Sequence, residues 1–525
     1  MLGIGQTSTW SLWTALALIL LAALLRQRYQ KGLNRYNGPI LASFTSLWRV
    51  WNTYRNSTNL PFLAWQEKYG DVIRLGPNML VFTDPACIKD IYTSGFDKSG
   101  QYMVNAGVSQ GKIVPNIFST DDKKWHSQLR RCVSNAFSLT SIVQYEAQVD
   151  QTLATFLEKM DSLFVHQKGM GSMDLGLWLQ YFAFDVIGKL SYSSSYGILE
   201  SDGRDDAMIH TISRFFEYVA MVGVWPMLDR LLRKNPILLF LGRHGWYDKP
   251  TPTVPYARKQ LATRKRNQLV EGSDAENPGQ GRQADILQKL LEAQRQQPDL
   301  IDDRTLLGLS LSAVNAGSDT VSTALSGILY YLLKHPSAME KAVKEIHSKL
   351  PPPAKSASLG EGVVSYSDGR SLPYLDACIQ EGLRLHPPAG GATFERVTPP
   401  QGATIAGHFI PGRTTVSGLA YLMNRHKPTF GEDALEYRPE RWLDNGGPEE
   451  EARLAAMNRA MFVFGIGPHT CLGRNIALLE IYKTIPTILR CFENRLSDPS
   501  LPIKISNFMV MNIRGLYVDV KRRDR

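Results

Sequence analysis

The first hydrophobic stretch of the chain is long enough to cross a membrane. Residues 10–25 are almost wholly apolar, and residues 4–9 can extend the run. An α-helix rises about 1.5 Å per residue, so a helix over residues 4–25 would be about 33 Å long and would span one bilayer. The turn signal Asn37-Gly38-Pro39 keeps it from running much further. This pattern predicts one amino-terminal transmembrane helix.

The charges beside this run distinguish an uncleaved anchor from a cleaved signal peptide. A signal peptide begins with positive residues, and residues 1–9 contain no Lys or Arg. The positive residues follow the run instead, at Arg26, Arg28, Lys31 and Arg35. This distribution favours an anchor that keeps the carboxyl-terminal side in the cytosol. We therefore expect an anchor with its basic flank at residues 1–36 and one folded domain at residues 37–525.

Beyond the anchor, the hydrophobic pattern predicts a mainly α domain with a minor β region. Two short apolar runs, residues 72–75 and 79–82, flank a Gly-Pro-Asn turn and are typical of a hairpin. Helical periodicity dominates from about residue 120 to 350, and short strands return over residues 397–418. The longest helical stretch runs from Asp302 to Lys334 and is stopped by His335-Pro336.

Composition and charge exclude several classes of protein. The 525 residues are 43% hydrophobic and 21% charged, which is globular and excludes a disordered or coiled-coil chain. The net charge of +10 is spread along the chain, with one basic cluster at residues 521–525, so we expect no nucleic-acid partner. Five widely spaced cysteines without a CxxC pair argue against a disulfide framework or a cysteine-rich zinc module.

The centre of the longest helix carries the unusual sequence Ala316-Gly317-Ser318-Asp319-Thr320. A glycine, an acid and two hydroxyl residues weaken a buried helix or offer its backbone competing hydrogen bonds. One interpretation is a kink without chemistry. The other is a locally widened helix that makes room for a small ligand, while Asp319 and Thr320 move protons.

A cysteine near the carboxyl terminus stands among glycines. The segment Phe464-Gly465-Ile466-Gly467-Pro468-His469-Thr470-Cys471-Leu472-Gly473 precedes a helix predicted from about Arg474 to Leu489. Glycines let backbone N–H groups converge on the sulfur, and the helix dipole also favours negative charge there. A lone cysteine is normally a small hydrophobic residue, but this setting indicates a ligating thiolate.

These segments resemble the cytochrome P450 superfamily of haem-thiolate monooxygenases. The glycine-rich segment is similar to the haem-ligand loop, with His469 where many members carry arginine. Residues 316–320 resemble the oxygen-activation motif, and Glu381-Gly382-Leu383-Arg384 resembles the E-x-x-R pair. Residues 439–442 resemble the segment whose arginine completes that pair. The resemblance covers essentially the whole chain and implies a cytochrome P450 fold preceded by one transmembrane helix.

The resemblance implies haem b (iron protoporphyrin IX) as the cofactor, with Cys471 as the axial ligand of the iron. Asp319 and Thr320 would deliver protons to bound oxygen. Glu381, Arg384 and Arg441 would form a buried charge network for folding and haem retention, without a catalytic role.

Partners for the two haem propionates follow from the same resemblance. Arg130 and Arg396 match family arginines, and His469 fills the position of a further one. His126 stands four residues before Arg130, where the superfamily often has tryptophan, so both share a helical face. We expect His126 to be the second partner on that helix, and an exposed His126 is the alternative.

The resemblance also implies where the substrate lies and which molecules supply electrons. The pocket would be lined by segments that are mostly apolar or small: Tyr102–Ile117, Phe215–Trp225, Val314–Ala316, Ala389–Thr393 and Phe508–Met511. We expect a lipophilic small-molecule substrate, O2, and NADPH electrons delivered by NADPH-cytochrome P450 reductase. A separate reductase is needed because the sequence has no evident dinucleotide fingerprint. The expected location is the endoplasmic reticulum membrane, single-pass, with the catalytic domain in the cytosol.

Longer segments resemble the fungal pisatin demethylase-like members, so we expect a step in fungal secondary metabolite biosynthesis. A monooxygenase that detoxifies xenobiotics or phytoalexins, such as a demethylase, is an alternative. A haem-thiolate isomerase or dehydratase that needs no reductase is another, although intact Asp319-Thr320 argues against it. A haem-binding sensor or carrier would need neither that pair nor an apolar pocket.

Overall fold

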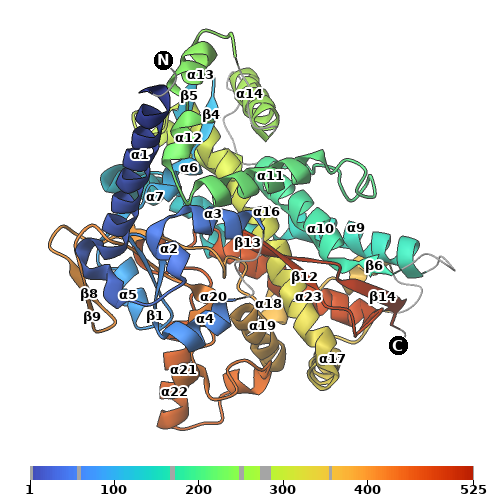
Figure 1. Cartoon of the computed structure of the whole chain (residues 1–525). Coiled ribbons are helices and arrows are strands. Elements are labelled where there is room, and N and C mark those ends of the chain that lie inside the picture. Colours follow the sequence, from blue (N-terminus) through green and yellow to red (C-terminus); the bar gives the residue numbers. More distant parts are fainter. Residues whose placement is uncertain are drawn as a thin grey trace.

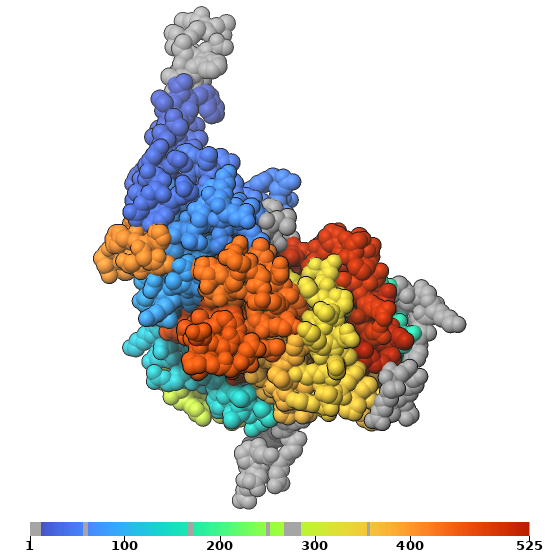
Figure 2. Space-filling view, turned by 90° about the horizontal axis from the view of Figure 1, so that it is seen from below, coloured from blue at the N-terminus to red at the C-terminus, as the bar shows by residue number. Residues whose placement is uncertain are grey.

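The computed structural model describes residues 4–55, 61–165, 172–247, 253–271, 285–353 and 358–523. Its first helix, α1 (Ile4–Tyr29), continues into the turn η1 (Gln30–Arg35) and extends away from the body (Figures 1 and 2). Apolar side chains such as Leu12 and Trp13 are 70% and 68% exposed. Among the described residues, one helix is long and apolar enough to cross a membrane, and it includes this segment.

The predicted long helix forms the centre of the molecule as α16 (Asp303–Lys334), which crosses the body in Figure 1. The Asp302 carboxylate caps its start by accepting a hydrogen bond from the Thr305 N–H at 2.7 Å. Proline begins the next helix, α17 (Pro336–Lys349), so α16 ends where the sequence predicted. Three helices pack along α16: α10 (Leu175–Tyr192), α19 (Pro373–Leu385) and α23 (Arg474–Cys491).

Further helices surround this centre. The longer ones are α3 (Leu47–Tyr54), α4 (Phe62–Tyr69), α7 (Lys123–Val133), α9 (Glu146–Met160), α11 (Ala207–Val222), α13 (Pro236–Arg243), α14 (Thr253–Glu271), α15 (Ile286–Gln296) and α22 (Pro448–Ala460). Shorter ones are α2 (Ile40–Phe44), α5 (Cys87–Tyr92), α6 (Gln101–Val104), α8 (Leu139–Gln144), α12 (Met227–Leu231), α18 (Tyr366–Arg370), α20 (Ala420–Met423) and α21 (Lys427–Phe430). The main apolar core joins α9, α10, α15, α16, α19 and α23.

The largest sheet contains the predicted hairpin and sets up part of the site. Its strands have the order β1 (Val72–Gly76), β2 (Met79–Phe82), β10 (Thr415–Gly418), β7 (Arg396–Val397) and β3 (Asp97–Lys98). The first two strands pair antiparallel, as the sequence predicted. β3 pairs antiparallel with β7, and this register places Lys98 directly opposite Arg396. Two positive side chains from distant parts of the chain are thereby neighbours.

Small sheets complete the minor β region. β11 (Phe492–Leu496), β14 (Tyr517–Arg522) and β6 (Met173–Asp174) form one sheet. Two-stranded pairs are β4 (Gly107–Ser109) with β5 (Lys112–Val114), β8 (Ala403–Ile405) with β9 (His408–Ile410), and β12 (Lys504–Phe508) with β13 (Val510–Arg514). β13 packs on α16, where the Thr323 hydroxyl donates to Asn512 Oδ1 at 2.6 Å.

Candidate functional site

Cys471 lies in a tight loop directly before α23. Gly465 and Gly467 have φ of +67° and +66°, a backbone conformation that favours glycine. The Cys471 N–H donates to the Phe464 carbonyl at 2.7 Å and closes the loop. The glycines that the sequence analysis singled out therefore shape the backbone that presents the sulfur.

The environment of Cys471 combines burial with access. Burial raises the pKa of the thiol, whereas the Gly473 N–H and the guanidinium groups of Arg130 and Arg474 lower it. The side chain is nevertheless accessible, and so is Ala316 in the middle of the central helix. A sulfur is both desolvated and accessible when it borders an internal space and protein encloses its other sides, and Cys471 has this combination of properties. Its neighbours are those that favour a thiolate.

Two histidines and three cations gather near this loop. The His126 and His469 rings lie 4.4 Å apart between centroids, and His126 is buried, so the exposed alternative is wrong. Burial, followed by Lys98, Arg130 and Arg396, lowers the pKa of His126 to about 4. Burial, followed by Arg396, Lys98, His126 and Arg130, lowers the pKa of His469 to about 3. These groups are therefore close enough that a positive charge on one disfavours protonation of the others.

Arg396 and Lys98 are held in place by neutral partners. Arg396 donates to the Tyr102 hydroxyl and to the Glu395 carbonyl. The Lys98 ammonium donates to the carbonyls of Ile117, Phe118 and Thr120 at 3.1, 2.8 and 2.9 Å. Burial and Arg396 lower the pKa of Lys98 to about 7, although Asp121 acts in the opposite direction.

We call Lys98, His126, Arg130, Arg396 and His469 the cationic cluster. Within the described ranges, none of its members forms an ion pair with a carboxylate. Buried positive charge without an internal counter-charge is costly, and an anion bound beside it would offset that cost. The cluster is therefore suited to a ligand that carries carboxylates.

The acid–alcohol motif lies on an unbroken stretch of α16. The Thr320 hydroxyl donates to the Ala316 carbonyl at 2.7 Å, and the Ser318 hydroxyl donates to the Val314 carbonyl at 3.1 Å. These bonds satisfy the hydroxyl groups within helical geometry, so neither the kink nor the widened turn that the sequence suggested interrupts the helix. Thr320 is half-buried, whereas Ser318 is fully buried.

Asp319 is buried at the contact between α16 and α10. Its Oδ1 accepts a hydrogen bond from Gln180 Nε2 at 2.6 Å, and its Oδ2 has no partner among the described residues. Burial raises the pKa of Asp319, while Gln180 and Arg514 act to lower it. Its free oxygen and raised pKa are properties of a group that exchanges a proton.

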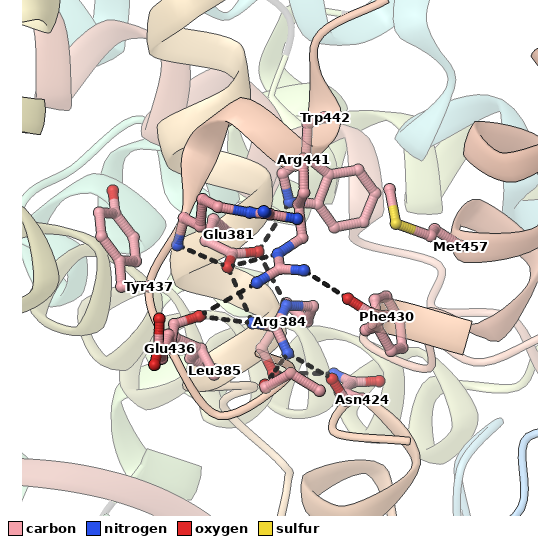
Figure 3. A network of polar contacts seen from close by, with 12 residues as sticks. Glu381, Arg384, Leu385, Asn424, Phe430, Glu436, Tyr437, Arg441, Trp442 and Met457 are labelled. Atoms are coloured by element: carbon pink, nitrogen blue, oxygen red, sulfur yellow. Dashed lines mark hydrogen bonds and ion pairs between the residues drawn. The ribbon is translucent and has the colours of Figure 1, made fainter. Parts of the chain in front are cut away.

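Glu381 and Arg384 form a bidentate pair on α19, at 2.8 Å for both contacts (Figure 3). Arg441, from η5 (Pro439–Trp442), joins Glu381 at 2.9 Å. The Trp442 indole N–H and the Arg438 backbone N–H also donate to this carboxylate, at 2.8 and 2.9 Å. All three charged side chains are 0% exposed. Both arginines donate further to backbone carbonyls of residues 424–436 (Figure 3).

A cavity of about 70 Å³ brings together three of the segments expected to line the substrate pocket. Its lining includes Ala220 and Val224, residues 391–393, and Met509. Gln101, which directly precedes the expected segment Tyr102–Ile117, also lines the cavity, whereas residues 314–316 do not. The aromatic residues Trp48, Phe62 and Trp65 of α3 and α4 also line the cavity, and the sequence analysis did not anticipate them.

Comparisons with known proteins decide which family this site belongs to. Residues 42–519 match the family model described as cytochrome P450. A cytochrome P450 monooxygenase of Aspergillus flavus is 34% identical over 496 residues, 94% of this chain and 93% of the relative. The monooxygenase cfoH of Aspergillus candidus is 34% identical over 536 residues, 100% of this chain and 95% of the relative. The monooxygenase mpaDE of Penicillium roqueforti is 34% identical, with 93% of this chain and 55% of that relative covered.

This chain belongs to the cytochrome P450 family. The resemblance and the fold class predicted from the sequence are confirmed, and the chain is a cytochrome P450 monooxygenase. The family implies haem, and the residues present fit this group. Cys471 offers a sulfur ligand, and the cationic cluster offers charge for two propionates. The space beside Gly473 is open, because a Cβ built there would meet no atom within 4 Å.

Within this cytochrome P450, the structure adds residues that sequence reasoning missed. Lys98 joins the cationic cluster through the β3–β7 pairing, and Tyr102 holds Arg396. Gln180 holds Asp319 from α10. Each contact joins residues far apart in the chain, and the hydrophobic pattern carries no signal for such pairings.

Proposed function

We propose that this cytochrome P450 inserts one atom of O2 into a lipophilic small molecule in fungal secondary metabolite biosynthesis. NADPH would supply the electrons through a separate cytochrome P450 reductase. The observation that carries the proposal is the accessible Cys471 thiol, set in a glycine loop and accompanied by a cationic cluster whose members form no ion pair with a carboxylate of the described residues. Haem b, when bound, supplies the iron on which O2 is activated.

Each residue at the site has a role that follows from its surroundings. Cys471 would ligate the iron as a thiolate, favoured by the Gly473 N–H and by the positive charge of Arg130 and Arg474. His126, Arg130, Arg396 and His469 would hold the haem propionates as hydrogen-bond donors or cations. Tyr102 holds Arg396 by a hydrogen bond, and Lys98, opposite Arg396 in the β3–β7 register, adds a further cation to this set.

Asp319 and Thr320 would deliver protons to the reacting oxygen. The Asp319 carboxyl is buried with one oxygen free, and burial raises its pKa towards the range in which it can exchange a proton. The Thr320 hydroxyl donates to Ala316 and still has acceptor capacity. We expect it to position water more than to give up its own proton.

Glu381, Arg384 and Arg441 would hold the fold and the haem pocket together without touching the reacting atoms. Every atom of their charged ends has a partner inside the protein, so no capacity remains for substrate. Such a network specifies local geometry more than it adds stability, but loss of one member leaves an uncompensated buried charge.

The cavity supports a lipophilic substrate that arrives from the membrane. Its wall joins aromatic and aliphatic side chains with a few polar ones, among them Arg49 and Asn507, and α3 and α4 follow closely after the apolar helix α1. We propose that residues 1–36 anchor the protein by a single pass in the endoplasmic reticulum membrane, with the catalytic domain, residues 37–525, in the cytosol. The fungal relatives support a fungal setting for the substrate.

A basic face beside the haem-ligand loop supports the reductase partner. Lys124 and Arg131 are exposed on α7, the helix that carries His126 and Arg130, and Lys123 is exposed there in an ion pair with Asp97. Positive residues around the site of electron entry would attract an acidic flavoprotein and raise its association rate.

Turnover with isotopic oxygen tests this function. Full-length protein in membranes, cytochrome P450 reductase, NADPH and ¹⁸O2 are incubated with a panel of lipophilic fungal metabolites. The expected result is a product that contains one labelled oxygen and forms only when both NADPH and reductase are present. Product formation without reductase, or label taken from water, would contradict the monooxygenase proposal.

A further inference from the structure

A chain of three polar side chains connects the partly exposed β13 to the buried acid of the central helix. Arg514 Nη1 donates to Gln180 Oε1 at 3.0 Å. Gln180 Nε2 donates to Asp319 Oδ1 at 2.6 Å. The three residues come from β13, α10 and α16, so three separate elements meet at this chain.

The direction of these hydrogen bonds is determined by the chemistry at the outer end. A guanidinium group donates only, so the Gln180 atom that faces Arg514 must be its carbonyl oxygen. The amide nitrogen must then face Asp319 and donate to it. Asp319 Oδ1 is therefore an acceptor in this arrangement, whereas Oδ2 is buried without a partner in the described part of the chain.

The charges around this chain are unevenly distributed. Gln180 is 2% exposed and Asp319 is 1% exposed, whereas Arg514 is half-buried. Arg514 forms no ion pair within the described residues, and its partner across the β12–β13 register is Lys504. Its charge acts on Asp319 and also on Tyr181, the neighbour of Gln180 on α10. Arg514 is thus the positive group that offsets the burial of the Asp319 carboxylate.

We propose that Gln180, oriented by Arg514, is a positioning residue that makes the two oxygens of Asp319 unequal. Oδ1 is held by the Gln180 amide in both protonation states. Oδ2 is the atom that takes up a proton, which neutralises the carboxylate, and that releases the proton, which restores the charge. This inference rests on the proposed function of Asp319 in proton delivery, and it assigns the residues that control its charge and orientation.

Infrared spectroscopy on the full-length holoenzyme tests the proposal without turnover. The protonated carboxyl stretch of Asp319 is followed against pH and identified by subtraction of the Asp319→Asn spectrum. In Gln180→Leu, the carboxylate loses a hydrogen bond, so the midpoint of this titration is expected to move to higher pH. Arg514→Gln should move it in the same direction, and Arg514→Lys, which keeps the charge, should move it less.

Gln148→Leu is the matched control, because Gln148 is a buried glutamine on α9 whose side-chain atoms have no hydrogen-bond partner among the residues that the structure describes. It tests the effect of replacing a buried glutamine without touching Asp319, and the titration should stay where it is. An unchanged Asp319 titration in Gln180→Leu, or an equal shift in Gln148→Leu, would overturn the proposal.

Turnover provides the second readout. In Gln180→Leu, coupled product formation is expected to fall about tenfold, less than the loss of a general acid or base itself. Coupling of NADPH consumption to product formation is expected to change with pH in a step that Asp319→Asn lacks. In Gln180→Leu, this step should move to higher pH together with the infrared midpoint. A fall in activity at every pH without such a shift would indicate a structural defect and would overturn the positioning role. Absence of product from the wild-type protein would instead count against the proposed function. The two failures can be told apart because the infrared titration does not require turnover.

Discussion

The Glu381 network is fully buried, whereas the cationic cluster is buried at His126 and Arg396 and half-buried at its other members, and the two regions differ in how their charges are satisfied. Glu381 accepts hydrogen bonds from Arg384, Arg441 and Trp442 (Figure 3), and both arginines use their remaining N–H groups on backbone carbonyls, with Arg441 also donating to the Asp433 carboxylate. The cationic cluster gathers three cations and two histidines whose lowered pKa values keep their rings neutral at neutral pH, and none of the five side chains forms an ion pair with a carboxylate in the described chain.

The difference separates a scaffold from a binding site. A network whose hydrogen bonds and ion pairs are all made within the protein has no free group for a ligand, so it serves to hold structural elements together. A set of buried and half-buried cations without an ion-paired carboxylate has unused capacity for an anion, and the cost of burying the charge is offset when the anion binds. Mutations in the two regions should therefore affect stability and haem binding in different proportions.

The largest effect is expected when the complete network is broken. Glu381→Gln leaves Arg384 buried without its counter-charge and leaves Arg441 with Asp433 alone, so it should lower the free energy of unfolding by about 3–5 kcal/mol, with loss of haem. Denaturant unfolding and haem content measure both effects. Glu432→Gln is the control, since its pair with Lys427 is exposed and should contribute less than about 1 kcal/mol. A Glu381→Gln protein as stable as this control would contradict the scaffold role.

In the cationic cluster, the two effects should separate. The Arg130 guanidinium has no hydrogen bond or ion pair among the described residues, and its charge lowers the pKa of both histidines. Arg130→Leu should therefore leave the stability of the haem-free protein unchanged or slightly higher, while haem affinity falls roughly 10- to 100-fold. Haem transfer to apomyoglobin and unfolding of the stripped protein measure the two quantities. Equal losses of both would show that Arg130 belongs to a scaffold.

A smaller structural effect with a clear chemical signature is expected at Thr320. Thr320→Ala removes one local hydrogen bond and should change the free energy of unfolding by about 0.5 kcal/mol or less. Haem should stay bound, but NADPH consumption should yield peroxide at the expense of product. Ser318→Ala removes the same kind of hydrogen bond from the same helix and should leave coupling intact. Equal coupling in the two variants would remove Thr320 from proton delivery.

An effect that depends on pH is expected at Glu480, a fully buried acid of α23 whose oxygens have no partner in the described chain. Burial raises its pKa well above the ordinary value. The unfolded chain therefore releases this proton at lower pH than the folded chain. The stability that Glu480 contributes is present below its unfolded pKa and is lost as the pH rises through its folded pKa.

Glu480→Gln cannot ionise, so its stability relative to the wild type should increase as the pH rises from about 4, near the pKa of the unfolded carboxyl, to about 8. Denaturant unfolding at several pH values measures the trend, with the exposed Glu67→Gln as control. A difference between Glu480→Gln and wild type that stays constant with pH would show that Glu480 finds a compensating partner.

Local patterns made much of the fold predictable. The hairpin at residues 72–82, the helix that begins after Asp302 and the loop that precedes Arg474 all follow from short-range signals. Motif resemblance brought Cys471, Asp319 and Glu381 to attention, and the structure places them in three different environments. The network around Glu381 spans about 60 residues but has a local E-x-x-R signature.

Long-range pairings could not be predicted from the same signals. Gln180 and Asp319 are 139 residues apart, and Arg514 lies a further distance along the chain on a strand with ordinary alternation. Lys98 reaches Arg396 only because a two-residue strand adds to the edge of a sheet. Such contacts depend on how complete elements pack, and no spacing within one element encodes them.

The central claim is that Cys471 is a thiolate ligand of haem. A carbon monoxide difference spectrum of the reduced protein in membranes, recorded for the wild type and for Cys471→Ala, tests it most directly. The wild type is expected to show the Soret shift that is typical of haem bound by a cysteine sulfur, and Cys471→Ala is expected to lose it together with turnover. A thiolate-type shift that persists in Cys471→Ala, or its absence from well-folded wild-type protein that contains haem, would contradict the account.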